Sequence, residues 1–105
     1  MSEQEVLNTI KSTIHSFLPS AKILVFGSRA KKLSKPCSDY DLLVVTENPL
    51  PEHEKASWRN RLNKILVRAI DAPVDVLINS EKEISVKKTF PGHVVQWALK
   101  EGFWL

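Results

Sequence analysis

The chain has 105 residues, with 15 Lys and Arg against 12 Asp and Glu, so its formal net charge is +3. This length predicts a single domain over residues 1–105 and excludes a second hydrophobic core. Hydrophobic residues make up 43% of the chain, which excludes a disordered protein, and no apolar run approaches the roughly 20 residues that cross a bilayer. We therefore expect a cytoplasmic protein with no membrane segment, whose small, dispersed positive charge permits nucleic-acid binding without indicating it.

Turn-forming residues cut the chain into alternating helical and extended segments. The first is a predicted helix over 3–18, because Ser2 and Glu5 have the spacing of a capping box and apolar residues follow at helical intervals. A short apolar run over 22–26 predicts a buried strand, since it is too brief for a helix. Residues 29–33, which follow it closely, can start a short helix.

The rest of the chain continues this alternation. Apolar, β-branched runs predict strands over 40–46 and 74–78, and the amphipathic stretch over 51–70 predicts the longest helix. Apolar residues at helical spacing also indicate a last helix: Phe90, Val94, Trp97 and Ala98. The predicted fold class is therefore α/β (α+β), with helices packed on a small mixed β-sheet.

A glycine–serine turn follows the first predicted strand. Gly27 lets the backbone approach a ligand closely, and the amide groups after it, with the Ser28 hydroxyl, can point at phosphate oxygens near a helix start. Such a turn more often serves only to redirect the chain. Arg29 is placed either to contact a phosphate or to act as a surface charge where the helix begins.

Two aspartates enter the second predicted strand. Asp39 and Asp41 flank Tyr40, and alternate side chains of a strand leave from the same face, so the two carboxylates are expected to lie close together. Close carboxylates repel each other unless a cation lies between them, and Mg²⁺ is the divalent ion best suited to such oxygen ligands. The alternative is a solvated strand entrance with Asp41 exposed.

Asp75 interrupts the otherwise apolar strand over 74–78. An acidic residue there is unfavourable for burial and for strand formation, so it needs a partner. If this strand lies beside the strand over 40–46, Asp75 joins Asp39 and Asp41 in a cluster of carboxylates. Two metal ions about 3.5–4 Å apart on such a cluster can bind nucleotide phosphates and stabilise a pyrophosphate leaving group. The alternative is an edge strand with Asp75 facing water.

These elements occur in the order of a known motif. The chain resembles the nucleotidyltransferase superfamily related to DNA polymerase beta, and most closely the minimal nucleotidyltransferases of prokaryotes. The resemblance extends over residues 23–78, more than half of the chain, and rests on three runs: Phe26–Ala30, Ser38–Leu42 and Val74–Val76.

The resemblance implies a role for each site residue. In that family the glycine and serine contact the β and γ phosphates of the nucleotide, which implies Gly27 and Ser28 here. The paired aspartates hold the metal ions, which implies Asp39 and Asp41. The third aspartate binds the catalytic metal and helps to activate the acceptor hydroxyl, which implies Asp75. The expected cofactor is Mg²⁺, as two ions, with ATP or another nucleoside triphosphate as substrate.

The resemblance also implies a partner. Minimal nucleotidyltransferases are typically paired with a small helical HEPN protein, often a ribonuclease toxin, which they neutralise by adding AMP to a tyrosine. We therefore expect the antitoxin of such a pair, forming an assembly with its partner and transferring AMP or another nucleoside monophosphate to a hydroxyl of that protein. The alternative is a non-catalytic subunit that inhibits its partner by contact. Nucleotidylation of a small molecule is a weaker reading, because those relatives carry an extra helical domain.

Some features depart from the motif or lie outside it. Family members often continue with an arginine and a glycine where this chain has Lys31 and Lys32, and lysine adopts a left-handed turn less readily than glycine. The two lysines either add charge near the triphosphate or are solvated. Trp58 and Trp97 lie on apolar helix faces and are expected in the core, and the apolar residues 103–105 either pack back on the sheet or face a partner.

Overall fold

The computed structural model describes residues 2–30 and 39–105, whose strands form one mixed sheet in the order β3-β2-β1-β4. Strand β1 is antiparallel to both β2 and β4, and β2 is parallel to β3. The strands are β1 (Lys22–Phe26), β2 (Tyr40–Thr46), β3 (Val74–Ser80) and β4 (Phe103–Trp104). The helices are α1 (Glu3–Phe17), α2 (Glu52–Ile70), α3 (Glu81–Lys87) and α4 (Val94–Glu101), with a 3-10 helix η1 (Gly27–Arg29). The expected fold class is confirmed.

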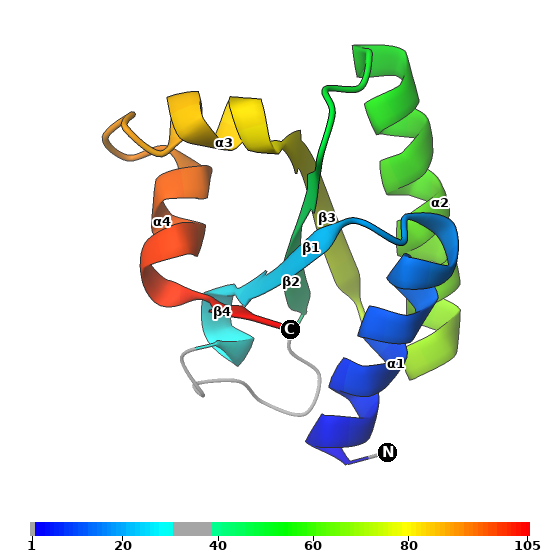
Figure 1. Cartoon of the computed structure of the whole chain (residues 1–105). Helices are drawn as coiled ribbons and strands as arrows, with labels where there is room; N and C mark the ends of the chain where they lie inside the picture. Colours follow the sequence, from blue (N-terminus) through cyan, green and yellow to red (C-terminus); the bar gives the residue numbers. More distant parts are fainter. Residues whose placement is uncertain (1, 31–38) are drawn as a thin grey trace.

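Helices α1 and α2 cover one face of the sheet, and α3 and α4 lie on the other side (Figure 1). The larger core cluster joins α1, α2 and the first face, with Ile10, Leu62 and Leu66 fully buried against Leu42 and Val44 of β2. Helix α2 is the crossover between the parallel strands β2 and β3, as parallel pairing requires. Among the described helices, none has the length and hydrophobicity needed to span a membrane.

The second face carries a smaller hydrophobic cluster within the same domain. Leu24, Leu43 and Val45 are buried there with Ala98 of α4, and Leu77 of β3 packs against them. Side chains alternate along a strand, so the residues two positions before Leu43 and Leu77 lie on this same face. Those residues are Asp41 and Asp75. The two carboxylates therefore share the α4 side of the sheet.

Capping boxes begin two of the helices. Ser2 and Glu5 cap α1 as the sequence predicts, with the Ser2 hydroxyl accepting from the Glu5 amide. Ser80 and Glu83 make the same arrangement at the start of α3, a helix that our sequence analysis did not predict. The signal was present in the spacing of this serine and glutamate, but the seven-residue helix is too short to show a clear apolar period.

Most predicted boundaries agree with the structure to within two residues, and the exceptions lie in the turn after β1 and in the last quarter of the chain. The short helix was expected over 29–33, whereas the 3-10 helix η1 covers Gly27–Arg29; residues 31–33 of this prediction lie outside the described part of the chain. Trp97 was expected in the core but is 59% exposed, because the buried residues of α4 are Val95 and Ala98. Residues 103–104 do pack back on the sheet, as the added strand β4.

Candidate active site

Asp41 and Asp75 are aligned residue for residue in the parallel pair β2–β3. Neighbouring strands lie about 4.8 Å apart, so two aligned aspartates on one face lie close together. Asp41 is half-buried and Asp75 is exposed at the outer strand of the sheet. The register therefore places Asp75 beside Asp41, as the sequence led us to expect if the two strands were neighbours.

Gly27 forms the third part of this corner. Its preceding residue, Phe26, pairs with Asp41 across β1 and β2, so the turn that begins at Gly27 starts against the aspartate. A Cβ atom built on Gly27 would lie 2.2 Å from Oδ2 of Asp41, which is far closer than real Cβ atoms approach other heavy atoms. The backbone φ of Gly27 is also positive, at 74°. Only glycine allows the turn to approach this carboxylate.

The carboxylates influence one another electrostatically. Burial raises the pKa of Asp41, and the negative charges of Asp75 and Asp39 raise it further. Asp39 is the exposed residue immediately before β2, two positions from Asp41. Ionisation of Asp41 is thus less favourable in the folded protein than in water, and a cation bound beside the carboxylate would offset this cost.

The donor set fits a hard divalent cation. All three groups supply carboxylate oxygens, which are the ligands that Mg²⁺ prefers, and like charge near Asp41 favours a cation beside it. Over residues 2–30 and 39–105, no group of three His, Cys, Asp or Glu side chains is arranged so that it could hold a metal ion by itself. Triphosphate oxygens commonly complete the coordination of such an ion.

Arg29 faces the opposite side of the sheet from these carboxylates. Its guanidinium carbon lies 4.2 Å from the centre of the Tyr40 ring, and its Nη1 atom is 3.9 Å from Oε2 of Glu3. The Tyr40 hydroxyl donates to the same Glu3 oxygen over 3.1 Å, and burial, followed by the Glu3 contact, raises the pKa of this tyrosine. The contact of Arg29 with a phosphate stays a prediction. The contact between Arg29 and Tyr40 was not predicted, because it depends on the direction of the turn after β1 and leaves no local signal in the sequence.

A cavity of about 550 Å³ opens beside the turn. One wall is formed by Phe26, Gly27 and Ser28, and another by Trp97 and Glu101 of α4. Its volume lies in the range of small-molecule sites. The exposure of Trp97 therefore places an indole ring at the wall of this cavity, a role that its apolar helical spacing did not suggest.

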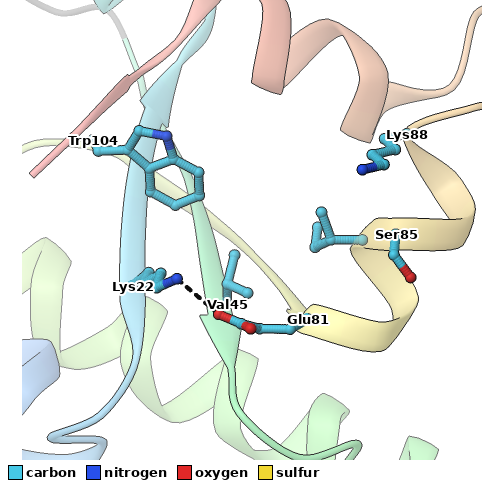
Figure 2. A pocket seen from close by; sticks show the side chains of 7 residues that line it. Lys22, Val45, Glu81, Ser85, Lys88 and Trp104 are labelled. Atoms are coloured by element: carbon cyan, nitrogen blue, oxygen red, sulfur yellow. Dashed lines mark ion pairs between the residues drawn. The ribbon is translucent and has the colours of Figure 1, made fainter.

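Figure 2 shows a second hollow on the same face of the sheet, with a volume of about 480 Å³. Lys22 and Val45, which pair across β1 and β2, line it together with Trp104, and Lys22 forms an ion pair of 2.9 Å with Glu81 of α3. This pair of strand residues is four positions along β1 from Phe26 and Asp41. The hollow includes none of the residues that the sequence predicts for the site.

The fold is that of a nucleotidyltransferase domain. Residues 7–98 match the family model described as a nucleotidyltransferase domain, so the chain belongs to this family. The chain is 35% identical over 48 residues to the probable protein adenylyltransferase MntA of Haemophilus influenzae, and the aligned segment covers 46% of this chain and 42% of that protein. It thus spans less than half of the curated relative.

Solved structures give the same fold. The chain is similar to a chain of a toxin–antitoxin complex with AMP-PNP, at a TM-score of 0.69 and 21% identity, covering 92% of this chain and 69% of that one. It is also similar to a chain of the complex between tri-AMPylated Shewanella oneidensis HEPN toxin and MNT antitoxin, at a TM-score of 0.64 and 20% identity, covering 98% and 71%. At these identities the likeness establishes the architecture alone.

Proposed function

We propose that this chain, acting as one domain, is a Mg²⁺-dependent nucleotidyltransferase that moves AMP, or another nucleoside monophosphate, from a nucleoside triphosphate to a hydroxyl of a partner protein. The observation that best supports this proposal is the approach of the Gly27 turn to Asp41, with Asp75 aligned on the next strand. A turn suited to phosphate and a group of carboxylates at one corner of a sheet can act on the same triphosphate.

Each residue has a part in this reaction. The backbone of Gly27 and the hydroxyl of Ser28 bind the β and γ phosphates, because the turn exposes amide groups without a side chain in the way. Asp39, Asp41 and Asp75 are the residues that would hold Mg²⁺, which when bound neutralises the phosphates and the leaving pyrophosphate. The acceptor is held on the Asp75 side, because β3 is the outer strand of the sheet and Asp75 is exposed there.

The bond changes follow from this placement. The acceptor oxygen attacks the α-phosphorus, the bond from that phosphorus to the bridging oxygen breaks, and pyrophosphate leaves with the electron pair. A carboxylate oxygen of Asp75 takes the proton of the attacking hydroxyl. Asp41 lies beside the start of the Gly27 turn, where it would help to hold Mg²⁺ next to the bound phosphates.

The partner class is the second half of the proposal. One relative is named as a probable protein adenylyltransferase, and the solved relatives are toxin–antitoxin complexes, one of them with a tri-AMPylated HEPN toxin. We extend this arrangement to the present chain: a cytoplasmic antitoxin that binds a small helical HEPN-type protein and modifies one of its hydroxyl groups with AMP. ATP is then the expected nucleotide.

Two measurements test the proposal. Mg-ATP at about 100 times its dissociation constant stabilises a protein by about 2.7 kcal/mol, which for a domain of this size raises the melting temperature by roughly 10–20 °C. We expect this shift for the wild type, its loss in Asp41→Asn, and its retention in Glu47→Gln, which changes an exposed carboxylate beyond the other end of β2. No shift with Mg-ATP or any other Mg-nucleotide would contradict the proposal.

Label transfer distinguishes catalysis from inhibition by contact. ATP labelled at the α-phosphate transfers its label to the co-purified partner, and ATP labelled at the γ-phosphate does not, because pyrophosphate leaves. Asp39→Asn abolishes the transfer and the neutralisation together. Neutralisation that survives this substitution would indicate a subunit that acts by contact alone.

A further inference from the structure

Tyr40 joins three separate segments of the chain behind the candidate active site. Its side chain is only 3% exposed and belongs to the core between the sheet and helices α1 and α2. Its ring lies under the guanidinium of Arg29, its hydroxyl donates to Glu3 of α1, and its backbone N–H donates to the carbonyl of Pro73 over 2.9 Å. Pro73 is the residue before β3. Tyr40 therefore contacts the turn, the first helix and the start of the third strand.

The functional groups of these segments lie on the other face. Asp41, which follows Tyr40 in β2, leaves from the α4 side of the sheet, whereas Tyr40 points to the α1 side. The turn divides in the same way: Gly27 and Ser28 line the cavity beside α4, and Arg29 packs on Tyr40. The contact between Arg29 and Tyr40 is thus directly behind the approach of Gly27 to Asp41.

We propose that Arg29 and Tyr40 are positioning residues that hold the phosphate turn against Asp41. This inference rests on the proposed function, since it concerns the geometry of that reaction. A guanidinium stacked on an aromatic ring and shielded from water is held more firmly than a solvated charge. The Arg29 side chain is 11% exposed, and Glu3 balances its charge while accepting from Tyr40.

This role differs from a direct contact with phosphate. A guanidinium that binds the triphosphate supplies charge. Lysine at position 29 should then replace arginine, and removal of the charge should weaken nucleotide binding. A guanidinium that stacks on Tyr40 supplies a planar surface, which lysine lacks. Its loss should displace the turn and slow the transfer step, because small misplacements of reacting groups cost about a hundredfold in rate.

A double-mutant cycle separates the two roles. The variants are Arg29→Gln, Tyr40→Leu and the double variant, with Arg29→Lys as the conservative change and Tyr40→Phe as the variant that keeps the ring. Arg61→Gln is the matched control, because Arg61 stacks on Trp58 at 4.8 Å in α2, away from the turn. The rate constant of AMP transfer and the KM for ATP are measured separately for each, with circular dichroism to confirm folding.

We expect Arg29→Gln and Tyr40→Leu each to lower kcat about tenfold or more with a smaller change in KM, and the double variant to lose no more than either single one. Arg29→Lys should not restore the rate, Tyr40→Phe should lose less than Tyr40→Leu, and Arg61→Gln should match the wild type. Additive losses, or a raised KM that lysine restores, would overturn the positioning role while leaving the transferase intact. A wild type that neither binds Mg-ATP nor transfers label would contradict the proposed function, and this role with it.

Discussion

Gly27 and Asp41 lie so close that no side chain at position 27 can coexist with the carboxylate where it stands. The distance of 2.2 Å from a built Cβ atom to Oδ2 leaves no room, and the φ of 74° adds a backbone cost for any residue but glycine. The geometry of the turn and the position of the aspartate are therefore linked. A substitution at either residue is therefore expected to displace the other.

Gly27→Ala tests this link. The left-handed backbone costs roughly 1–2 kcal/mol for alanine, and the overlap with Asp41 adds to it. Gly92→Ala is the matched control, because Gly92 has nearly the same φ, 75°, with nothing within 4 Å of a built Cβ. We expect Gly27→Ala to lower the free energy of unfolding by more than Gly92→Ala in a urea titration. Equal losses would mean that Asp41 moves away without cost.

Asp41→Asn should make the metal-free protein more stable at neutral pH. Burial and the charges of Asp75 and Asp39 raise the pKa of Asp41, so its ionised form is disfavoured in the folded state. An asparagine removes that charge. The measurement is the melting temperature in EDTA, with Glu47→Gln as a control that should leave it unchanged. A less stable Asp41→Asn protein would show that its carboxylate makes favourable contacts.

The same substitution predicts a pH dependence. Because the folded pKa of Asp41 is raised above its ordinary value, the folded state holds this proton more tightly than the unfolded state. The wild type therefore loses stability relative to Asp41→Asn as the pH rises through the interval between the unfolded and the folded pKa. The difference in melting temperature between the two proteins should be largest at neutral pH and narrow as the pH falls through that interval. A difference in melting temperature that stays constant with pH would contradict the raised pKa of Asp41.

Nucleotide binding should be visible in the fluorescence of one tryptophan. Of the three tryptophans in the chain, Trp97 lines the cavity beside Gly27 and Ser28, and Trp104 lines the second hollow (Figure 2). We expect Mg-ATP to quench the emission of the wild type and of Trp104→Phe, but not of Trp97→Phe. Quenching that is lost only in Trp104→Phe would place the nucleotide in the second hollow.

Ser80→Ala should weaken the attachment of α3. Ser80 caps this helix, and Glu83 of the same capping box pairs with Lys55 of α2. Loss of the cap is expected to cost about 1 kcal/mol of unfolding free energy. Ser85→Ala, an exposed serine of the same helix, should cost much less. Equal effects in a denaturant titration would show that the cap does not stabilise α3.

The strands of the sheet could be predicted because each of them is a short apolar run bounded by turns. The limits of β1 and β2 agree with the prediction to the residue, and β3 extends two residues further. Their pairing could not be read from the same pattern, since the identity of neighbouring strands depends on contacts between distant residues. The alignment of Asp41 with Asp75 is such a contact, and it decides whether the aspartates form one site.

The residues around the carboxylates, Trp97 and the pair Arg29 and Tyr40, were harder to predict from the sequence. Trp97 has the spacing of a core residue, and its exposure depends on which side of α4 faces the sheet, which the local pattern does not specify. The contact between Arg29 and Tyr40 depends on the turn after β1, whose direction follows from the positive φ of Gly27. Sequence reasoning therefore identified the residues that bear charge more readily than those that support them.

Strand β4 has a consequence for the order in which the molecule folds. It pairs with β1 through Leu24 and Trp104, and Leu105 donates to the carbonyl of Ile23, so the outer edge of β1 is completed by residues that come after every other element. Strands β1, β2 and β3 with α1 and α2 are available once Ser80 has been synthesised. We expect this unit to assemble first and the two-residue strand to join late, with its amide protons exchanging with solvent faster than those of β2.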